Sequence, residues 1–148
     1  MVSEKTFIFR YRKTIKKNMM NTILIANITN SLLEDAISKT CSQKLLLIHE
    51  DNLSKKPLGL LISGLNLPAN FKVSYHHVPL DDLKLAYSKV TKIVHKAFEK
   101  SDDVHFALEA NLLGLQIMEA AKEFEIKNYY IVQGEKLKKI KACFIRGF

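Results

Sequence analysis

The chain lacks the features that mark several large classes of protein. It has no apolar run close to the ~18 residues that a membrane span needs. No apolar stretch with a small-residue cleavage site follows its basic N-terminus, and it has only two cysteines, Cys41 and Cys143. We therefore expect no membrane span and no secretory signal, and a cytoplasmic location in which cysteines stay reduced. A disulfide between Cys41 and Cys143 is the less favoured alternative.

Common nucleotide and metal motifs are also missing. The sequence has no G-x-G-x-x-G after its first predicted strand and no G-x-x-x-x-G-K-[ST], which argues against a nicotinamide dehydrogenase and a P-loop nucleotidase. The five histidines form neither H-x-x-x-H nor H-E-x-x-H, and neither cysteine is close to a histidine in sequence. We therefore expect no metal ion and no cofactor.

Length and composition predict one globular domain, because 148 residues with 47% apolar and 26% charged residues suffice for a single core. The net charge of +8 belongs to the two ends. Residues 1–20 carry six basic residues and one acidic residue, residues 135–148 carry five and one, and the segment between them has a charge of −1. We expect a basic extension over residues 1–20 and a compact domain over residues 21–148 with a basic tail. Solvated ends are the favoured interpretation, and nucleic-acid binding through them is the alternative.

From residue 22 onward, apolar runs alternate with amphipathic stretches. The predicted strands are Thr22–Ile28, Lys44–His49, Phe71–Val78, Val104–Leu108, Tyr129–Val132 and a final Ile140–Ile145. The predicted helices are Leu32–Thr40, Pro57–Leu65, Asp81–Lys100 and one after Asn111, whose predicted apolar face is Leu112, Leu115, Ile117, Met118, Ala121 and Phe124. This alternation predicts an α/β three-layer sandwich, in which a mainly parallel Rossmann-like sheet has helices on both faces. The continuous apolar run of Thr22–Ile28 predicts a central strand, and the alternating Phe71–Val78 a strand nearer an edge.

Two of the predicted strands end in polar turns that lead into helices. The residues of these turns are Asn27, Thr29, Asn30 and Ser31 after the first strand, and Glu109, Ala110, Asn111 and Leu112 after the fourth. In open α/β sheets, ligands bind beyond the carboxyl ends of the strands where the strand order reverses, and helix N-termini attract phosphates. Helix capping explains each polar residue taken alone. The two turns taken together favour a ligand site.

The order of elements resembles that of the CARF domain, the CRISPR-associated Rossmann fold. The residues that carry the resemblance are the long helix before VHFALEANLLGLQIMEAA and the closing YYIV. Archaeal CRISPR-associated regulators and small stand-alone ring nucleases are the most similar members. The resemblance implies a homodimer that binds a cyclic oligoadenylate across its two-fold axis, between the two turns described above. The fourth-strand turn departs from the family pattern, because Glu109 stands where many members carry glycines and a lysine or arginine.

The leading hypothesis is a stand-alone CARF-like protein of antiviral defence that binds a cyclic oligoadenylate, in sequestration, sensing or slow cleavage. Without a lysine in the turn, binding is favoured over catalysis, and an enzyme would be a metal-independent ring nuclease. The alternative is a non-enzymatic regulatory or DNA-associated module without a nucleotide ligand. The helix after Asn111 has more leucines than one sheet face needs, so we predict that Leu113 is the surplus one and lies in a dimer interface.

Overall fold

The computed structural model describes residues 22–50, 55–124, 126 and 128–141. The expected basic extension, the end of the tail and Cys143 lie outside these residues, so the predictions about them stay predictions. The strands are β1 (Thr22–Ala26), β2 (Lys44–Glu50), β3 (Lys72–Val78), β4 (Asp103–Leu108), β5 (Asn128–Gln133) and β6 (Lys136–Lys141). The helices are α2 (Leu32–Thr40), α3 (Lys55–Ser63), α4 (Leu83–Lys100) and α5 (Leu112–Ala121).

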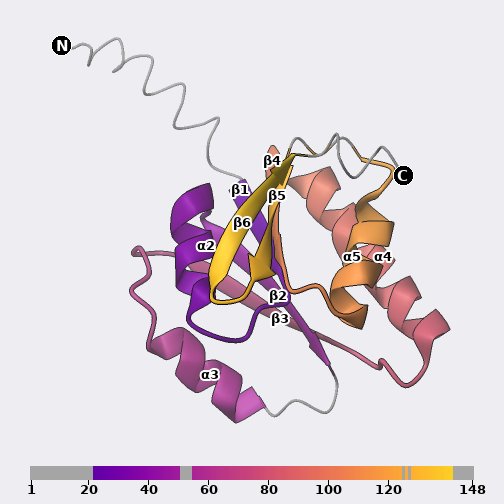
Figure 1. Cartoon of the computed structure of the whole chain (residues 1–148), viewed down its shortest axis with the longest axis horizontal. Helices are drawn as coiled ribbons and strands as arrows, with labels where there is room; N and C mark the ends of the chain where they lie inside the picture. The colour runs from indigo at the N-terminus through magenta and orange to yellow at the C-terminus, as the bar shows by residue number, and fades with distance from the viewer. Residues whose placement is uncertain (1–21, 51–54, 125, 127, 142–148) are drawn as a thin grey trace, which may run out of the picture.

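The six strands form one sheet in the order β3-β2-β1-β4-β5-β6. All neighbouring pairs are parallel except β5 and β6, which are antiparallel. Helices α2 and α3 lie on one face of the sheet and α4 and α5 on the other (Figure 1). The predicted three-layer α/β sandwich with a mainly parallel sheet is confirmed. Strand β1 is central and β3 is at an edge, as the apolar patterns of the two strands predict.

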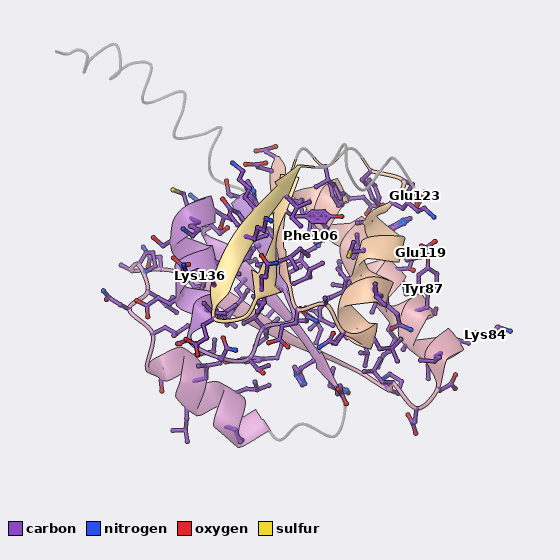
Figure 2. The ribbon with its side chains drawn as sticks, viewed as in Figure 1. Lys84, Tyr87, Phe106, Glu119, Glu123 and Lys136 are labelled. Carbon is purple, nitrogen blue, oxygen red and sulfur yellow. The ribbon has the colours of Figure 1, made fainter. Side chains whose placement is uncertain are left out.

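Side chains of the central strand alternate between two cores because successive residues of a strand point to opposite faces. Leu24 of β1 packs in the core beneath α2 and α3, and Ile25 packs in the core beneath α4 and α5. The largest fully buried side chain, Phe106 of β4, belongs to the second core. Figure 2 shows Phe106 in the interior, whereas Lys84 and Tyr87 project from the outer side of α4. Burial on both faces makes β1 and β4 a firm base for the turns that follow them.

The last described strand begins four residues before the predicted Ile140–Ile145, and residues 142–145 of that prediction lie outside the described part of the chain. Strand β6 begins at Lys136, directly after a two-residue turn at Gly134 and Glu135. Gly134 has a φ of +66°, a conformation that a side chain disfavours and that tight hairpin turns require at this position. The exposed side chains of Lys136, Lys138 and Lys139 lie on this edge strand, where charge discourages pairing with another chain.

The predicted apolar face of α5 is also rotated from the real one. The buried residues of α5 are Leu113, Gly114, Ile117, Ala120 and Ala121. Leu112 and Leu115 are instead 46% and 58% exposed. The surplus leucines are therefore Leu112 and Leu115, and the prediction for Leu113 is wrong, because Leu113 is only 4% exposed and packs in the core.

None of the described helices combines the length and the apolar content that crossing a bilayer requires.

Candidate functional site

The two polar turns meet at the carboxyl edge of the sheet. Strands β1 and β4 are parallel neighbours, and Ala26 at the end of β1 is paired with Ala107 near the end of β4. From β1 the chain continues to β2 on one side of the pair, and from β4 it continues to β5 on the other side. The strand order therefore reverses between β1 and β4, which is where open α/β sheets bind ligands.

Asn27 links the two turns by hydrogen bonds. Its side chain is almost fully buried, with 5% exposed. The Asn27 Oδ1 atom accepts from the backbone N–H of Glu109 at 2.7 Å, and its Nδ2 atom donates to Oδ1 of Asn111 at 2.9 Å. A weaker bond runs from Nδ2 to the Glu109 carbonyl oxygen at 3.4 Å. Because a buried amide needs partners on both of its ends, Asn27 fixes the turn after β4 against the turn after β1.

Asn111 begins helix α5 and shares its side chain between two partners. Its Oδ1 atom accepts from the backbone N–H of Gly114 at 2.9 Å, the usual bond of a helix N-cap, and also from Asn27. Gly114 is required by the packing here, because a Cβ atom built on it would overlap the carbonyl oxygen of Glu109. The missing side chain of Gly114 thus lets α5 approach the turn closely.

Helix α2 is capped by one of the three polar residues that directly precede it, Thr29, Asn30 and Ser31. Asn30 Oδ1 accepts from the backbone N–H of Leu32 at 2.9 Å. Ser31 is already in a helical conformation and its side chain makes no capping bond. The side chains of Thr29 and Ser31 are exposed, and neither hydroxyl has a hydrogen bond within the described part of the chain. Two hydroxyls of this turn therefore have no partner among the described residues.

The two turns carry negative rather than positive charge. The residues of the two turns supply amides, hydroxyls and the single carboxylate of Glu109, but no lysine, arginine or histidine. The Glu109 carboxylate accepts a long hydrogen bond of 3.4 Å from Asn111 Nδ2. Glu34 and Asp35 stand in the first turn of α2, where acids suit the positive end of the helix. An anionic ligand would have to be held here by N–H and hydroxyl donors.

The structure thus brings all eight predicted residues to one edge but gives them different tasks. Asn27, Asn30 and Asn111 hold the turns and helix starts together. The side chains of Thr29, Ser31, Ala110 and Leu112 are exposed at the rim, and Glu109 is half-buried. Capping is therefore a sufficient explanation for Asn30 and Asn111, and the exposed residues are those that remain free to meet a ligand.

Exposed leucines lie next to the turn after β4. Leu112 and Leu115 of α5 are exposed, as is Leu83 at the start of α4 with 50% of its surface accessible. The side chain of Gln116 donates to the Leu83 carbonyl oxygen at 3.4 Å, which joins the beginnings of the two helices. We call Leu83, Leu112 and Leu115 the leucine patch. Exposed leucines at the beginnings of neighbouring helices can mark a contact with another protein.

The sequence interpretation missed a second hollow at the opposite end of the sheet, between α4 and the first residues of β1 and β2. Its signal was present in the sequence: Lys92, Lys96 and Lys100 recur every four residues and therefore share one face of a helix.

No group of three residues able to ligate a metal ion occurs among the described residues. No protein-family model matches the chain, and comparison with curated proteins finds no sequence similar to it.

Proposed function

We propose that this protein binds a cyclic oligoadenylate at the carboxyl edge of the sheet, over the turns after β1 and β4, with a second copy of the chain completing the site. The observation that carries the proposal is the direct linkage of the two turns through Asn27, at the one place where the strand order reverses. A ligand that contacts both turns would meet a surface already held in place, so little conformational entropy would be lost on binding.

The chemistry of the rim suits a phosphate-linked nucleotide through neutral donors. The first turn of α5 presents backbone N–H groups at the positive end of the helix dipole, and phosphates bind readily at such ends. The hydroxyls of Thr29 and Ser31 stand on the opposite rim and have no partner among the described residues. These groups are suited to ribose and phosphate oxygens. The Glu109 carboxylate opposes binding, because its negative charge repels the phosphates.

Binding is favoured over cleavage. Cleavage of the ring requires the ribose 2′-hydroxyl to be aligned with the phosphate and the developing negative charge to be stabilised. The residues of the two turns include no cationic side chain for that charge. We therefore assign the protein a role in sequestering or sensing the ring, with slow cleavage as the secondary activity to be tested.

The leucine patch supplies a reason for a homodimer at this edge. Leu112 directly follows Asn111 of the turn after β4, and a two-fold contact through the leucine patch would bring the turns of two copies together. A ring ligand with its own rotational symmetry can then contact both copies alike. Replacing Leu115 with glutamate should convert a dimer to a monomer in light scattering at micromolar concentration. Leu60 provides the control, because it is 66% exposed on α3, on the other face of the sheet.

Calorimetric titration with cyclic tetra-adenylate tests the proposal, and linear tetra-adenylate is the comparison. We expect saturable binding of the ring with one ring for two chains, and weaker binding of the linear form. The variant Ser31→Glu adds a negative charge to the rim without removing a hydrogen bond, and should weaken binding. Absence of heat and of any thermal shift with the wild-type chain at high ligand concentration would overturn the proposal.

A further inference from the structure

The amino end of the sheet carries a groove with a strong positive charge. The groove has a volume of about 630 Å³ and lies between α4 and the strands β1, β2 and β3. The basic residues that line it are Lys44, His76, Lys92, Lys96 and Lys100, and no acidic residue lines it. Lys44 is the first residue of β2 and Thr22, also in the lining, is the first of β1. The groove is therefore separate from the cleft at the carboxyl ends of β1 and β4.

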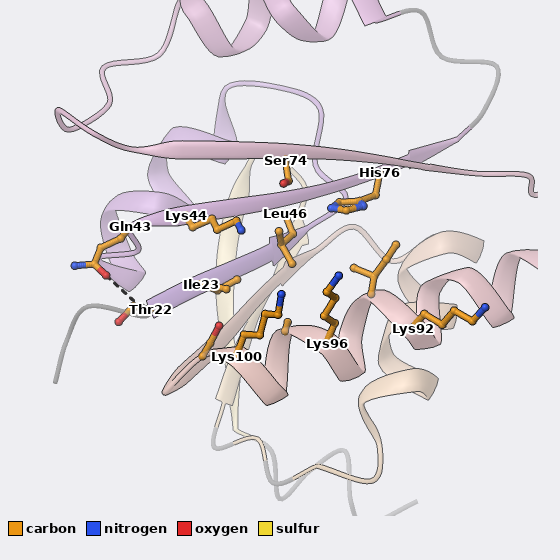
Figure 3. A pocket seen from close by; sticks show the side chains of 13 residues that line it. Thr22, Ile23, Gln43, Lys44, Leu46, Ser74, His76, Lys92, Lys96 and Lys100 are labelled. Carbon is orange, nitrogen blue, oxygen red and sulfur yellow. Dashed lines mark hydrogen bonds between the residues drawn. The ribbon is translucent and has the colours of Figure 1, made fainter. Parts of the chain in front are cut away.

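The lysines converge on the groove from two elements. Figure 3 shows Lys96 and Lys100 extending from α4 toward the sheet, and Lys44 and His76 entering the same space from β2 and β3. Lys92 extends along the helix, away from the other lysines (Figure 3). Successive lysines of α4 are separated by four residues, or about 6 Å along the helix axis. The three converging ammonium groups thus face one shared volume.

No carboxylate of the described residues forms an ion pair with these lysines. Within the described part of the chain, none of the four lysines belongs to an ion pair. Like charges placed around one hollow repel one another, and a bound anion relieves that repulsion. The charge pattern therefore points to an anionic occupant.

The pKa of His76 reflects both its burial and the positive charge of the groove. Burial is the main cause that lowers the pKa of His76 from its usual 6.5, and the nearby Lys44, His49, Lys96 and His77 lower it further. A neutral imidazole can accept or donate a hydrogen bond without adding charge. A bound anion would favour the protonated ring, so binding should be accompanied by uptake of a proton.

We infer that the groove binds a small organic polyphosphate of nucleotide size. Its volume is in the range of small-molecule sites. The apolar residues Ile23, Leu46, Ile93 and Ala97 are also part of its lining, which suits a base or another flat apolar group. The lysine ammonium groups of the same lining suit the phosphates.

A long nucleic-acid strand fits the groove less well. Asp102 and Asp103 follow Ser101, the last lining residue on this side, and Asp103 is paired with Thr22 in the sheet. A strand that ran out of the groove past Thr22 would meet these two carboxylates. The acids therefore limit the occupant to a short molecule.

Titration of the full chain with ATP and with inorganic triphosphate, by calorimetry at low and moderate salt, tests the inference. The variant Lys96→Gln/Lys100→Gln should lose about tenfold in affinity for both probes and show a shallower dependence on salt. The control Lys84→Gln/Lys122→Gln removes the same charge at exposed positions outside the groove and should stay within about twofold of the wild type. Both variants keep the basic termini, so an equal loss in the two would overturn the inference.

Two further outcomes are decisive. ATP should bind more tightly than inorganic triphosphate, and equal affinity would mean that the apolar lining residues do not contact the ligand. The third probe is a twenty-residue oligothymidylate. If it binds more tightly than ATP and its affinity falls equally in the Lys96→Gln/Lys100→Gln variant, the occupant is a nucleic-acid strand. That result would overturn the assignment of a small molecule. A negative result in these titrations does not bear on the test with cyclic tetra-adenylate, because that test concerns the opposite end of the sheet.

Discussion

Replacing Asn27 with alanine should destabilise the protein far more than a typical loop substitution. The side chain makes two short hydrogen bonds, of 2.7 Å with the Glu109 N–H and of 2.9 Å with Asn111 Oδ1. Each is worth about 1 kcal/mol net, and an unsatisfied buried N–H adds a penalty of about 1 kcal/mol or more, so the expected loss is about 3 kcal/mol. This is a large part of the 5–15 kcal/mol that stabilises a typical domain.

Urea denaturation followed by circular dichroism measures this loss. Ser31→Ala is the matched control, because Ser31 stands at the start of α2 in an equivalent turn but its side chain makes no capping bond. Its free energy of unfolding should change by less than about 0.5 kcal/mol. A double-mutant cycle between Asn27→Ala and Asn111→Ala should give a coupling energy of about 1 kcal/mol. A loss below about 1 kcal/mol for Asn27→Ala would refute the reasoning that this side chain joins the two turns.

Three other predictions follow from named contacts. Gly114→Ala should lower the free energy of unfolding by about 2 kcal/mol because its Cβ would overlap the Glu109 carbonyl oxygen, whereas Gly59→Ala, with nothing within 4 Å, should raise it by about 0.5 kcal/mol in thermal unfolding. Similar shifts for the two variants would contradict the close approach of α5. Glu109→Gln should strengthen binding of cyclic tetra-adenylate about fivefold at low salt and less at high salt, and calorimetry showing no change would mean that the carboxylate does not face the ligand. Because the pKa of His76 is lowered in the folded state, the unfolded chain binds more protons below pH 6.5, so stability should fall as the pH drops from 7.5 to 5.5. Urea titrations of His76→Asn should show a flatter profile, and an unchanged slope would contradict this assignment.

The fold was predictable because its strongest signals are local. The continuous apolar run in β1 specifies a strand covered on both faces, and the alternation in β3 specifies an edge. The position of the candidate cleft followed from the topology rule alone. The hydrogen bonds that join the two turns could not be predicted, because the bond from Asn27 to Asn111 joins residues 84 positions apart in the sequence.

Two local features were misassigned for physical reasons. Helix α5 is apolar on most of its surface, so periodicity alone did not identify its buried side. Gly114 decides the question, since only a residue without a side chain can face the Glu109 carbonyl group. The start of the last described strand was predicted four residues too late because the glycine that begins the β5–β6 turn was not recognised as a hairpin signal. The basic groove was missed because Lys44 lies far in sequence from the lysines of α4, and only the folded chain brings them together.

Backbone amide NMR of the full chain, recorded during titration with cyclic tetra-adenylate, tests the central claim most directly. The ring should shift the resonances of residues 29–31 and 110–113 most strongly and leave those of Lys96 and Lys100 nearly unchanged. An unperturbed spectrum, or shifts confined to the groove beside α4, would contradict a binding site between the turns after β1 and β4.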